Sequence, residues 1–287
     1  MMEPVSKFHK GSGALLLLAA LAGALAACLP KPDEPIEWLQ RPDAVIVQKK
    51  TVNDAASELE QRLTVPEFTL YGDGTLIYER MRGIGYGLPI LEAELSEEAI
   101  RGLLESIGDE GFLEFAYDQP RRASAVDVPT TYLYVQTKAA ANAVSAYGLG
   151  FELPEDAGKE WDQFRRIEKI ARRLDEFDPS EWGASAEGEF VPEAGLLLVQ
   201  RAGEADEDPG RPAWPVPEVS LAGVAPPDGD VGETHIEGAL AGRLAQLFSL
   251  DEAAVYREDE QSFVVLFEPV LPHEEHFPEF DRPPEHR

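Results

Sequence analysis

The fold is decided by residues 68–78, which read Phe68-Thr69-Leu70-Tyr71, then Gly72-Asp73-Gly74, then Thr75-Leu76-Ile77-Tyr78. Two runs rich in β-branched and aromatic residues flank a short loop, and the loop glycines can adopt the positive φ that a tight turn needs. The stretch therefore predicts a β-hairpin. Asp73 is a candidate calcium ligand, but the regular alternation of acids in a calcium-binding loop is missing around it, and turn formation explains it better.

The segments on either side of this hairpin predict one further strand and a helix. Residues 44–48 precede it and read Ala-Val-Ile-Val-Gln, which favours a strand. After it, Ser96 followed by Glu97 and Glu98 is typical of a helix start, because serine caps free N–H groups and acids suit the positive end of the helix dipole. One apolar face then follows, made by Ile100, Leu103, Leu104 and Ile107.

The same order of elements occurs a second time. Residues 131–135 and 143–147 predict another hairpin, and a longer helix is expected over about 159–177, before Pro179. The apolar face of this helix is made by Trp161, Phe164, Ile167, Ile170, Ala171 and Leu174. An order of hairpin, helix, hairpin and helix indicates an α+β fold, with helices packed on one face of an antiparallel sheet. We assign this domain to residues 43–179.

A smaller α+β domain is predicted over residues 188–271, after a small and polar stretch at 180–188. Its expected elements are a strand at 196–200, a long loop at 202–232, a helix at about 237–248, and strands at 254–257 and 263–267. The last segment, residues 272–287, is polar, charged and rich in proline, so we expect it to be a flexible tail.

The N-terminus is an export signal. Lys7 and Lys10 precede an uncharged run of 17 residues from Gly11 to Ala27, which is shorter than the roughly 20 apolar residues that cross a bilayer. The run ends in Leu25-Ala26-Ala27-Cys28, which resembles the lipobox of bacterial lipoproteins: an aliphatic residue, two small residues and a cysteine.

This resemblance implies that a lipoprotein signal peptidase removes residues 1–27 and that Cys28 becomes the lipid-carrying first residue of the mature protein. Its thiol would carry a diacylglyceryl group and its amino group often an acyl chain, and two or three chains anchor stably where one does not. The alternative is a buried cysteine inside a simple anchor helix. Cys28 is the only cysteine of the chain, so it cannot form an intramolecular disulfide.

Residues 28–42 follow the anchor as an extended, proline-rich tether. Trp38 is expected either to dock on the first domain or to lie at the level of the lipid headgroups. The lipoprotein resemblance places the protein on the extracytoplasmic side of the cell membrane or the outer membrane. Leu29 follows the cysteine where an aspartate would favour retention, which favours the outer membrane in a two-membrane bacterium.

The chain is strongly acidic, with 54 Asp and Glu against 25 Lys and Arg and a formal charge of −29. The leader holds two lysines and one glutamate, so its removal leaves −30. Such a surface repels nucleic acid and anionic headgroups, and we expect no nucleic-acid partner. Solubility or adaptation to salt explains the charge better than a surface for cations or for a basic partner.

The histidines provide the few candidate chemical sites. His273 and His276 are weak metal-ligand candidates, because they are three residues apart where the zinc-protease pattern needs four, and a solvated tail is the favoured interpretation. His235 has Glu233 and Glu237 beside it, which suits acid–base chemistry, but it lies at the expected start of a helix, where polar residues are usual. We assign no catalytic residue and expect no cofactor.

The hairpins and helices over about 65–177 resemble a layout found in bacterial lipoproteins of unknown function, which implies no activity. The leading hypothesis is a non-enzymatic interaction or envelope-assembly module, binding between its two domains or through tyrosines on an exposed strand face: Tyr71, Tyr78, Tyr132, Tyr134 and Tyr147. Half-buried packing in the sheet is the alternative for these tyrosines. The alternative functions are a metal-dependent or hydrolytic envelope enzyme and a solute-binding lipoprotein, the latter disfavoured because alternating β-α-β units are missing.

Overall fold

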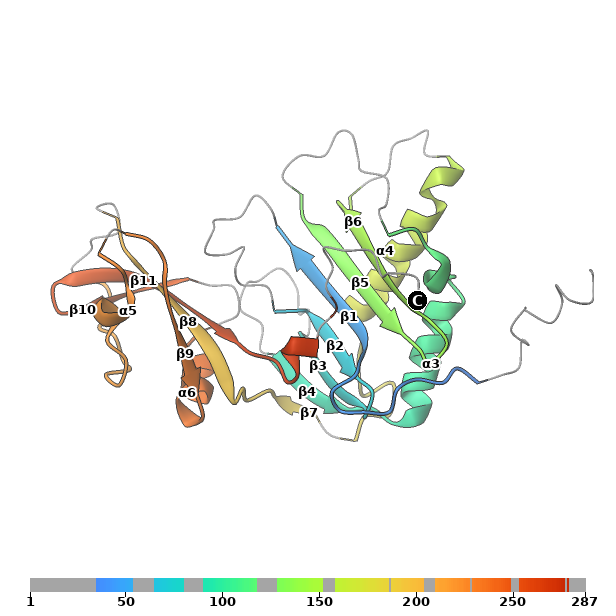
Figure 1. The fold of residues 1–287 in the computed structure, drawn as a ribbon, viewed down its shortest axis with the longest axis horizontal. Coiled ribbons are helices and arrows are strands. Elements are labelled where there is room, and N and C mark those ends of the chain that lie inside the picture. The colour runs from blue at the N-terminus through green and yellow to red at the C-terminus, as the bar shows by residue number, and fades with distance from the viewer. Residues whose placement is uncertain are drawn as a thin grey trace, which may run out of the picture. The chain divides into compact units, whose positions relative to one another are not determined.

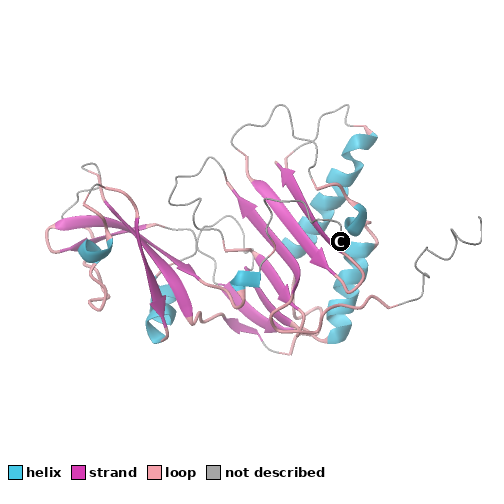
Figure 2. Cartoon of the chain, in the orientation of Figure 1, coloured by secondary structure: helices cyan, strands magenta, loops and turns pink. Residues whose placement is uncertain are grey.

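In a computed structural model, the described part of the chain forms two antiparallel β-sheets with helices, an α+β fold (Figures 1 and 2). The described residues are 35–53, 65–79, 90–117, 128–151, 158–185, 187–203, 210–227, 229–248, 253–276 and 278. Residues Glu37–Arg287 belong to one structural unit. The predicted fold class is confirmed.

The first sheet has seven strands in the order β6-β5-β1-β2-β3-β4-β7, and all neighbours are antiparallel. The strands are β1 (Val45–Val52), β2 (Phe68–Tyr71), β3 (Thr75–Glu79), β4 (Ile90–Glu94), β5 (Thr130–Gln136), β6 (Ala141–Tyr147) and β7 (Glu187–Glu189). Both predicted hairpins are present, β2 with β3 and β5 with β6. The first strand is also confirmed, and it continues four residues beyond the predicted end, Gln48.

The turn of the first hairpin uses its glycines in two different ways. Gly74 has a φ of +104°, as the turn requires. Gly72 does not have a positive φ, and it is needed for space, because a Cβ there would lie 1.7 Å from the carbonyl oxygen of Leu39. Asp73 accepts a hydrogen bond from the Thr75 N–H (3.0 Å), which confirms turn formation as its role. Trp38 is buried and donates its indole N–H to the Gly72 carbonyl (3.0 Å), so this part of the tether docks on the hairpin.

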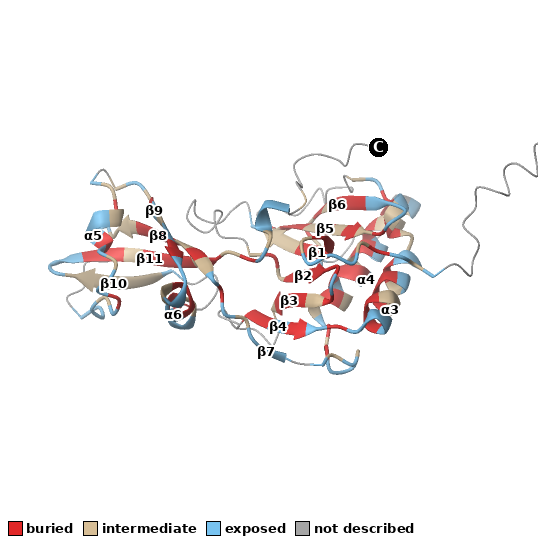
Figure 3. Ribbon diagram, turned by 60° about the horizontal axis from the view of Figure 1, so that its bottom comes forward, coloured by how far each residue is buried: buried red, intermediate tan, exposed pale blue. Residues whose placement is uncertain are grey.

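Two helices, α3 (Glu97–Gly108) and α4 (Asp162–Asp175), cover one face of this sheet (Figures 1 and 3). Ser96 caps α3 by accepting the Ala99 N–H at 3.2 Å, as predicted. The apolar face predicted for each helix is the buried face. The short 3-10 turns η1 (Phe112–Glu114) and η2 (Lys159–Trp161) follow α3 and precede α4.

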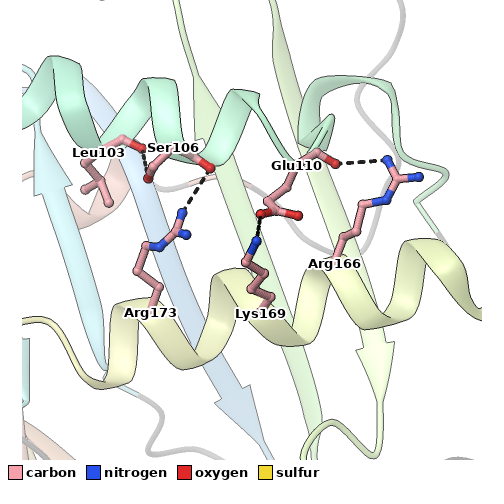
Figure 4. A network of polar contacts seen from close by, with 6 residues as sticks. All are labelled: Leu103, Ser106, Glu110, Arg166, Lys169 and Arg173. Atoms are coloured by element: carbon pink, nitrogen blue, oxygen red, sulfur yellow. Dashed lines mark hydrogen bonds and ion pairs between the residues drawn. The ribbon is translucent and has the colours of Figure 1, made fainter.

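Polar contacts connect α3 and the turn after it to α4 (Figure 4). Arg173 donates to the Ser106 carbonyl at 2.9 Å, and Arg166 donates to the Glu110 carbonyl at 3.2 Å. Lys169 forms an ion pair with the Glu110 carboxylate. The exposed sides of the two helices therefore hold each other in place while their apolar sides pack on the sheet.

The second sheet has four strands in the order β10-β11-β8-β9. Its elements are β8 (Ala194–Arg201), α5 (Leu221–Val224), β9 (Gly232–Glu237), α6 (Ala239–Leu247), β10 (Ala254–Glu258) and β11 (Gln261–Pro269), and a last 3-10 turn, η4 (Glu274–His276), follows them. The core lies between α5, α6 and the sheet, and it includes Leu197, Val199, Ile236, Leu244 and Phe263.

The structure corrects the prediction for residues 232–238. The predicted loop ends at residue 232 and the predicted helix begins at about residue 237, but residues 232–237 form the strand β9 and the helix begins at Ala239. Strand β7 is a second addition, since Glu187–Glu189 pair with β4 and extend the first sheet beyond residue 179. The division of the chain into domains at 179 and 188 stays a prediction.

Candidate interaction surface

The side of the first sheet that α3 and α4 leave uncovered is the helix-free face, and strand register decides which tyrosines lie on it. Residues directly opposite each other in antiparallel strands share a face. Tyr78 lies opposite Phe68, whose ring contacts Phe177 just after α4 (centroids 5.5 Å apart), so Tyr78 is on the helix-covered face. Tyr71 and Tyr134 pack in one cluster on the helix-free face.

The prediction of one exposed tyrosine face is therefore wrong for two of its five members. Tyr71 and Tyr78 are each 1% exposed and lie on opposite faces of the sheet. Tyr132 and Tyr147 share the helix-free face with Tyr134, because strand residues alternate and Tyr147 lies opposite Thr130. These three tyrosines are half-buried, as the alternative interpretation proposed.

Residues Leu271–His276, here called the C-terminal strap, lie against the helix-free face (Figure 1). Leu271 is 2% exposed and packs in the cluster that contains Tyr71 and Tyr134. The Tyr71 hydroxyl donates to the Pro272 carbonyl at 2.5 Å, and the Tyr71 and His273 rings meet edge to face at 6.3 Å. This part of the predicted flexible tail is thus in contact with the sheet, and residues 279–287 lie outside the described residues.

Burial and acidic neighbours shift the pKa values under the strap. Burial, followed by the nearby carboxylates of Glu274, Asp73 and Glu275, raises the pKa of Tyr71 above its usual range. Loss of hydration also raises the pKa of Glu274, although the ammonium group of Lys50 opposes this. Tyr71 is therefore a neutral hydrogen-bond donor at neutral pH.

The two weak metal candidates lie in the strap. The rings of His273 and His276 are 6.2 Å apart, and His276 Nε2 is 3.8 Å from the Asp43 carboxylate. Among the described residues, no three His, Cys, Asp or Glu side chains come together as a possible metal site. The structure thus gives these two histidines no third ligand within the described part of the chain.

His235 lies in the middle of β9, opposite Leu196, and its side chain is exposed. The expectation that it begins a helix is wrong, because Gly232–Glu237 pair with β8 along their whole length. Within the described ranges, no hydrogen bond or ion pair is recorded for the imidazole of His235. Its neighbours Glu233 and Glu237 share its face of the strand, since strand side chains alternate.

A buried ionic group lies on the helix-covered face. The Lys49 ammonium is 2.8 Å from Asp175 and 3.5 Å from Glu67, and the lysine is 6% exposed. Burial alone would lower the pKa of Lys49, but the two carboxylates outweigh it and raise that pKa. The group joins β1 to the end of α4, which is a structural role, and sequence reasoning missed it because its members are far apart in the chain.

A groove of about 820 Å³ lies beside α6 in the second part of the chain and is called the α6 groove here. The segment before β8 contributes Val191 and Glu193, the end of β9 contributes Glu237, and α6 contributes Gly242 and Arg243. Val191 is 63% exposed, an unusual position for a large apolar side chain. No sequence pattern pointed to this groove.

The predicted leader, Cys28 and the first part of the tether lie outside the described residues. Across the described parts of the chain, no helix is both long enough and apolar enough to span a membrane. No protein-family model matches the chain, and comparisons with curated proteins and with solved structures likewise found no match.

Proposed function

We propose that the chain is a lipid-anchored extracytoplasmic protein that acts as a non-enzymatic interaction module at the bacterial envelope. The lipid anchor is supported by one observation: the sequence Leu25-Ala26-Ala27-Cys28 ends an uncharged run, and the sequence contains no other cysteine. Two or three acyl chains on Cys28 give stable attachment to a membrane. The tether then leads to Trp38, which is docked on the first hairpin.

The interaction surface of this proposal is the part of the helix-free face that carries Tyr132, Tyr134 and Tyr147. Half-buried tyrosines offer large apolar area at low entropic cost and a polar tip, and aromatic side chains are enriched in binding surfaces for these reasons. The Tyr134 hydroxyl donates to Gln136 (3.0 Å), so its ring orientation is fixed before a partner binds. The resemblance to other lipoproteins supports the location and implies no activity.

The anchor is tested by metabolic labelling with a fatty-acid probe. The wild-type chain should be labelled and recovered with membranes, whereas Cys28→Ser should lose both the label and the membrane attachment. Labelling that persists in Cys28→Ser would overturn the lipobox assignment.

The surface is tested with a photo-crosslinking amino acid placed at Tyr132 in cells. We expect a discrete adduct that depends on Cys28, since the anchor brings the surface to its envelope partner. The same amino acid at Tyr78 is the matched control, because that tyrosine is buried on the other face of the same sheet. Equal adducts at both positions, or none at Tyr132, would contradict the proposed surface.

A further inference from the structure

Strand β9 forms one edge of the four-stranded sheet, and the phase of its ladder shows which backbone groups face outward. The Gly238 N–H donates to the Glu193 carbonyl at 2.7 Å, and this pair continues the register of β8 with β9. Hydrogen-bonded pairs alternate along an antiparallel ladder. Residues 232, 234 and 236 therefore bond to β8, while the N–H and C=O groups of His235 and Glu237 point away from the sheet.

These outward groups form an open edge. Within the described residues, no backbone hydrogen bond beyond the β8 ladder is recorded for His235 or Glu237, and both residues are exposed. The opposite edge is different: a segment at Pro212–Trp214 covers β10 through the Arg257 N–H to Pro212 bond and the Trp214 N–H to Arg257 bond, each 2.8 Å. An exposed row of unpaired backbone groups is a template for another strand.

Charge decides which strand fits. A second copy of this chain, paired antiparallel about His235, would place Glu233 of one copy opposite Glu237 of the other, and like charges directly opposite each other are destabilising. The formal charge of −29 on the chain adds a long-range repulsion between copies. A basic strand avoids both costs, because its lysine or arginine would lie opposite the exposed carboxylate of Glu237.

The α6 groove adjoins the end of this edge, since Glu237 belongs to both. Its wall contains the exposed Val191 next to Gly242, whose missing side chain leaves the helix surface flat (a Cβ at Gly242 would be 3.1 Å from Val191). An extended segment that pairs with β9 places alternate side chains on the two faces of the sheet. One set of its side chains would lie on the face of the sheet that carries Glu237. The other set would lie on the face that carries Ile236 and packs against α6.

From these observations we infer that the β9 edge and the α6 groove form a docking site for an extended basic peptide segment, which adds to the sheet as a fifth strand through its main chain. Its basic side chains pair with the acids of the edge, and its alternate apolar side chains pack toward α6. This inference goes beyond the proposed function, because it concerns a different sheet and a different recognition mode from the tyrosine surface.

The test uses the full-length chain in detergent and a capped nine-residue peptide of alternating lysine and valine. Amide hydrogen exchange read by mass spectrometry should show new, saturable protection in the fragment that contains His235 and Glu237. A glutamate–valine peptide of the same length and a lysine–valine peptide N-methylated on alternate residues should each bind at least about tenfold more weakly, because they lose the charge pairing or the main-chain donors.

A variant pair separates main-chain pairing from side-chain contact. His235→Pro removes the outward N–H, which an edge strand tolerates, and should weaken lysine–valine binding about tenfold, whereas His235→Thr keeps the N–H and should bind like wild type. Equal binding by His235→Pro and wild type, or by the N-methylated peptide, would overturn the docking site. If His235→Pro does not fold, the N-methylated peptide still decides the question.

Two further outcomes would also overturn the inference. Protection of β9 that grows with protein concentration alone would identify a second copy of the chain as the occupant. Equal binding of the glutamate–valine and lysine–valine peptides would show that the site does not select basic side chains. Neither outcome affects the crosslinking at Tyr132 that tests the proposed function, so the two proposals fail separately.

Discussion

At the scale of single residues, the buried ammonium of Lys49 links strand to helix through charge. Its partners Asp175 and Glu67 have side chains that are 22% and 24% exposed, so they remain partly hydrated while the lysine does not. Removing one charge from a buried ionic group leaves the remaining charges uncompensated. The resulting loss of folding free energy is larger than the net contribution of the intact group. Lys49→Met should therefore lower the free energy of unfolding by about 3 kcal/mol at pH 7.

The pH dependence of this variant checks the cause. Because the pKa of Lys49 is raised in the folded state, its contribution is complete below the unfolded value of 10.5 and declines as pH rises through the folded value. The difference between wild type and Lys49→Met in the free energy of urea unfolding should thus be constant from about pH 6 to 9 and shrink as the pH rises above 10.5. A difference that does not shrink as the pH rises above 10.5 would show that packing, and not charge, is lost.

Gly72 allows a second prediction at the scale of single residues, because the backbone of Leu39 packs closely against it. Gly72→Ala would place a methyl group 1.7 Å from the Leu39 carbonyl oxygen, and backbone cannot move aside as a flexible side chain does. We expect a loss of about 2 kcal/mol or more in the free energy of unfolding, with the Trp38 fluorescence shifted toward that of a solvated indole. Gly188→Ala is the matched control, since nothing lies within 4 Å of a Cβ there, and its stability should equal that of wild type.

At the scale of elements, the sequence predicted those that carry a strong local signal. The hairpin at residues 68–78 and helices α3 and α4 have the turn residues, the cap and the apolar periodicity that specify them without tertiary context. Strand β9 was missed because its sequence, Gly-Glu-Thr-His-Ile-Glu, has one strongly apolar residue, and its pairing with β8 supplies the rest. β7, Glu-Gly-Glu, has no local signal at all.

The candidate sites were harder to predict because they depend on register and on contacts between distant segments. Alternation within one strand places Tyr132 and Tyr134 together, but only the pairing of β2 with β3 puts Tyr71 and Tyr78 on opposite faces. The strap contact between Tyr71 and Pro272 joins residues 201 positions apart. The open edge of β9 follows from strand order, which no local pattern contains.

The prediction at the scale of elements concerns the C-terminal strap. Leu271→Ala removes a side chain that is 98% buried among Val45, Tyr71 and Ile77, so we expect the free energy of unfolding to fall by about 2–3 kcal/mol. Hydrogen exchange should also rise in the fragment that contains residues 272–276, because the strap loses its apolar contact. Glu275→Ala changes an exposed residue of the same strap and should leave both measurements near wild type. Unchanged exchange in Leu271→Ala would show that the contacts of Tyr71 with Pro272 and His273 hold the strap without Leu271.

At the scale of the whole molecule, the formal charge of −29 on the chain sets how the folded state responds to salt. Repulsion between like charges destabilises the compact state. Salt weakens this repulsion, since the Debye length falls from about 30 Å at 0.01 M to about 8 Å at 0.15 M. The same repulsion acts between copies of the chain, and the acids on the β9 edge likewise disfavour pairing with a second copy. Solubility, adaptation to salt and a cation-binding surface all predict stabilisation by salt, and they differ in which cation is needed.

We expect general screening to explain the effect. The melting temperature of the full-length chain in detergent should rise by several degrees between 0.01 M and 0.5 M sodium chloride, and potassium chloride should act equally, because screening depends on ionic strength. Calcium chloride at matched ionic strength should then add no separate saturable step, since screening depends on ionic strength and not on the identity of the cation. A calcium transition that saturates at micromolar concentration would instead show that the acidic surface binds a specific cation, because binding to the folded state alone raises stability by mass action.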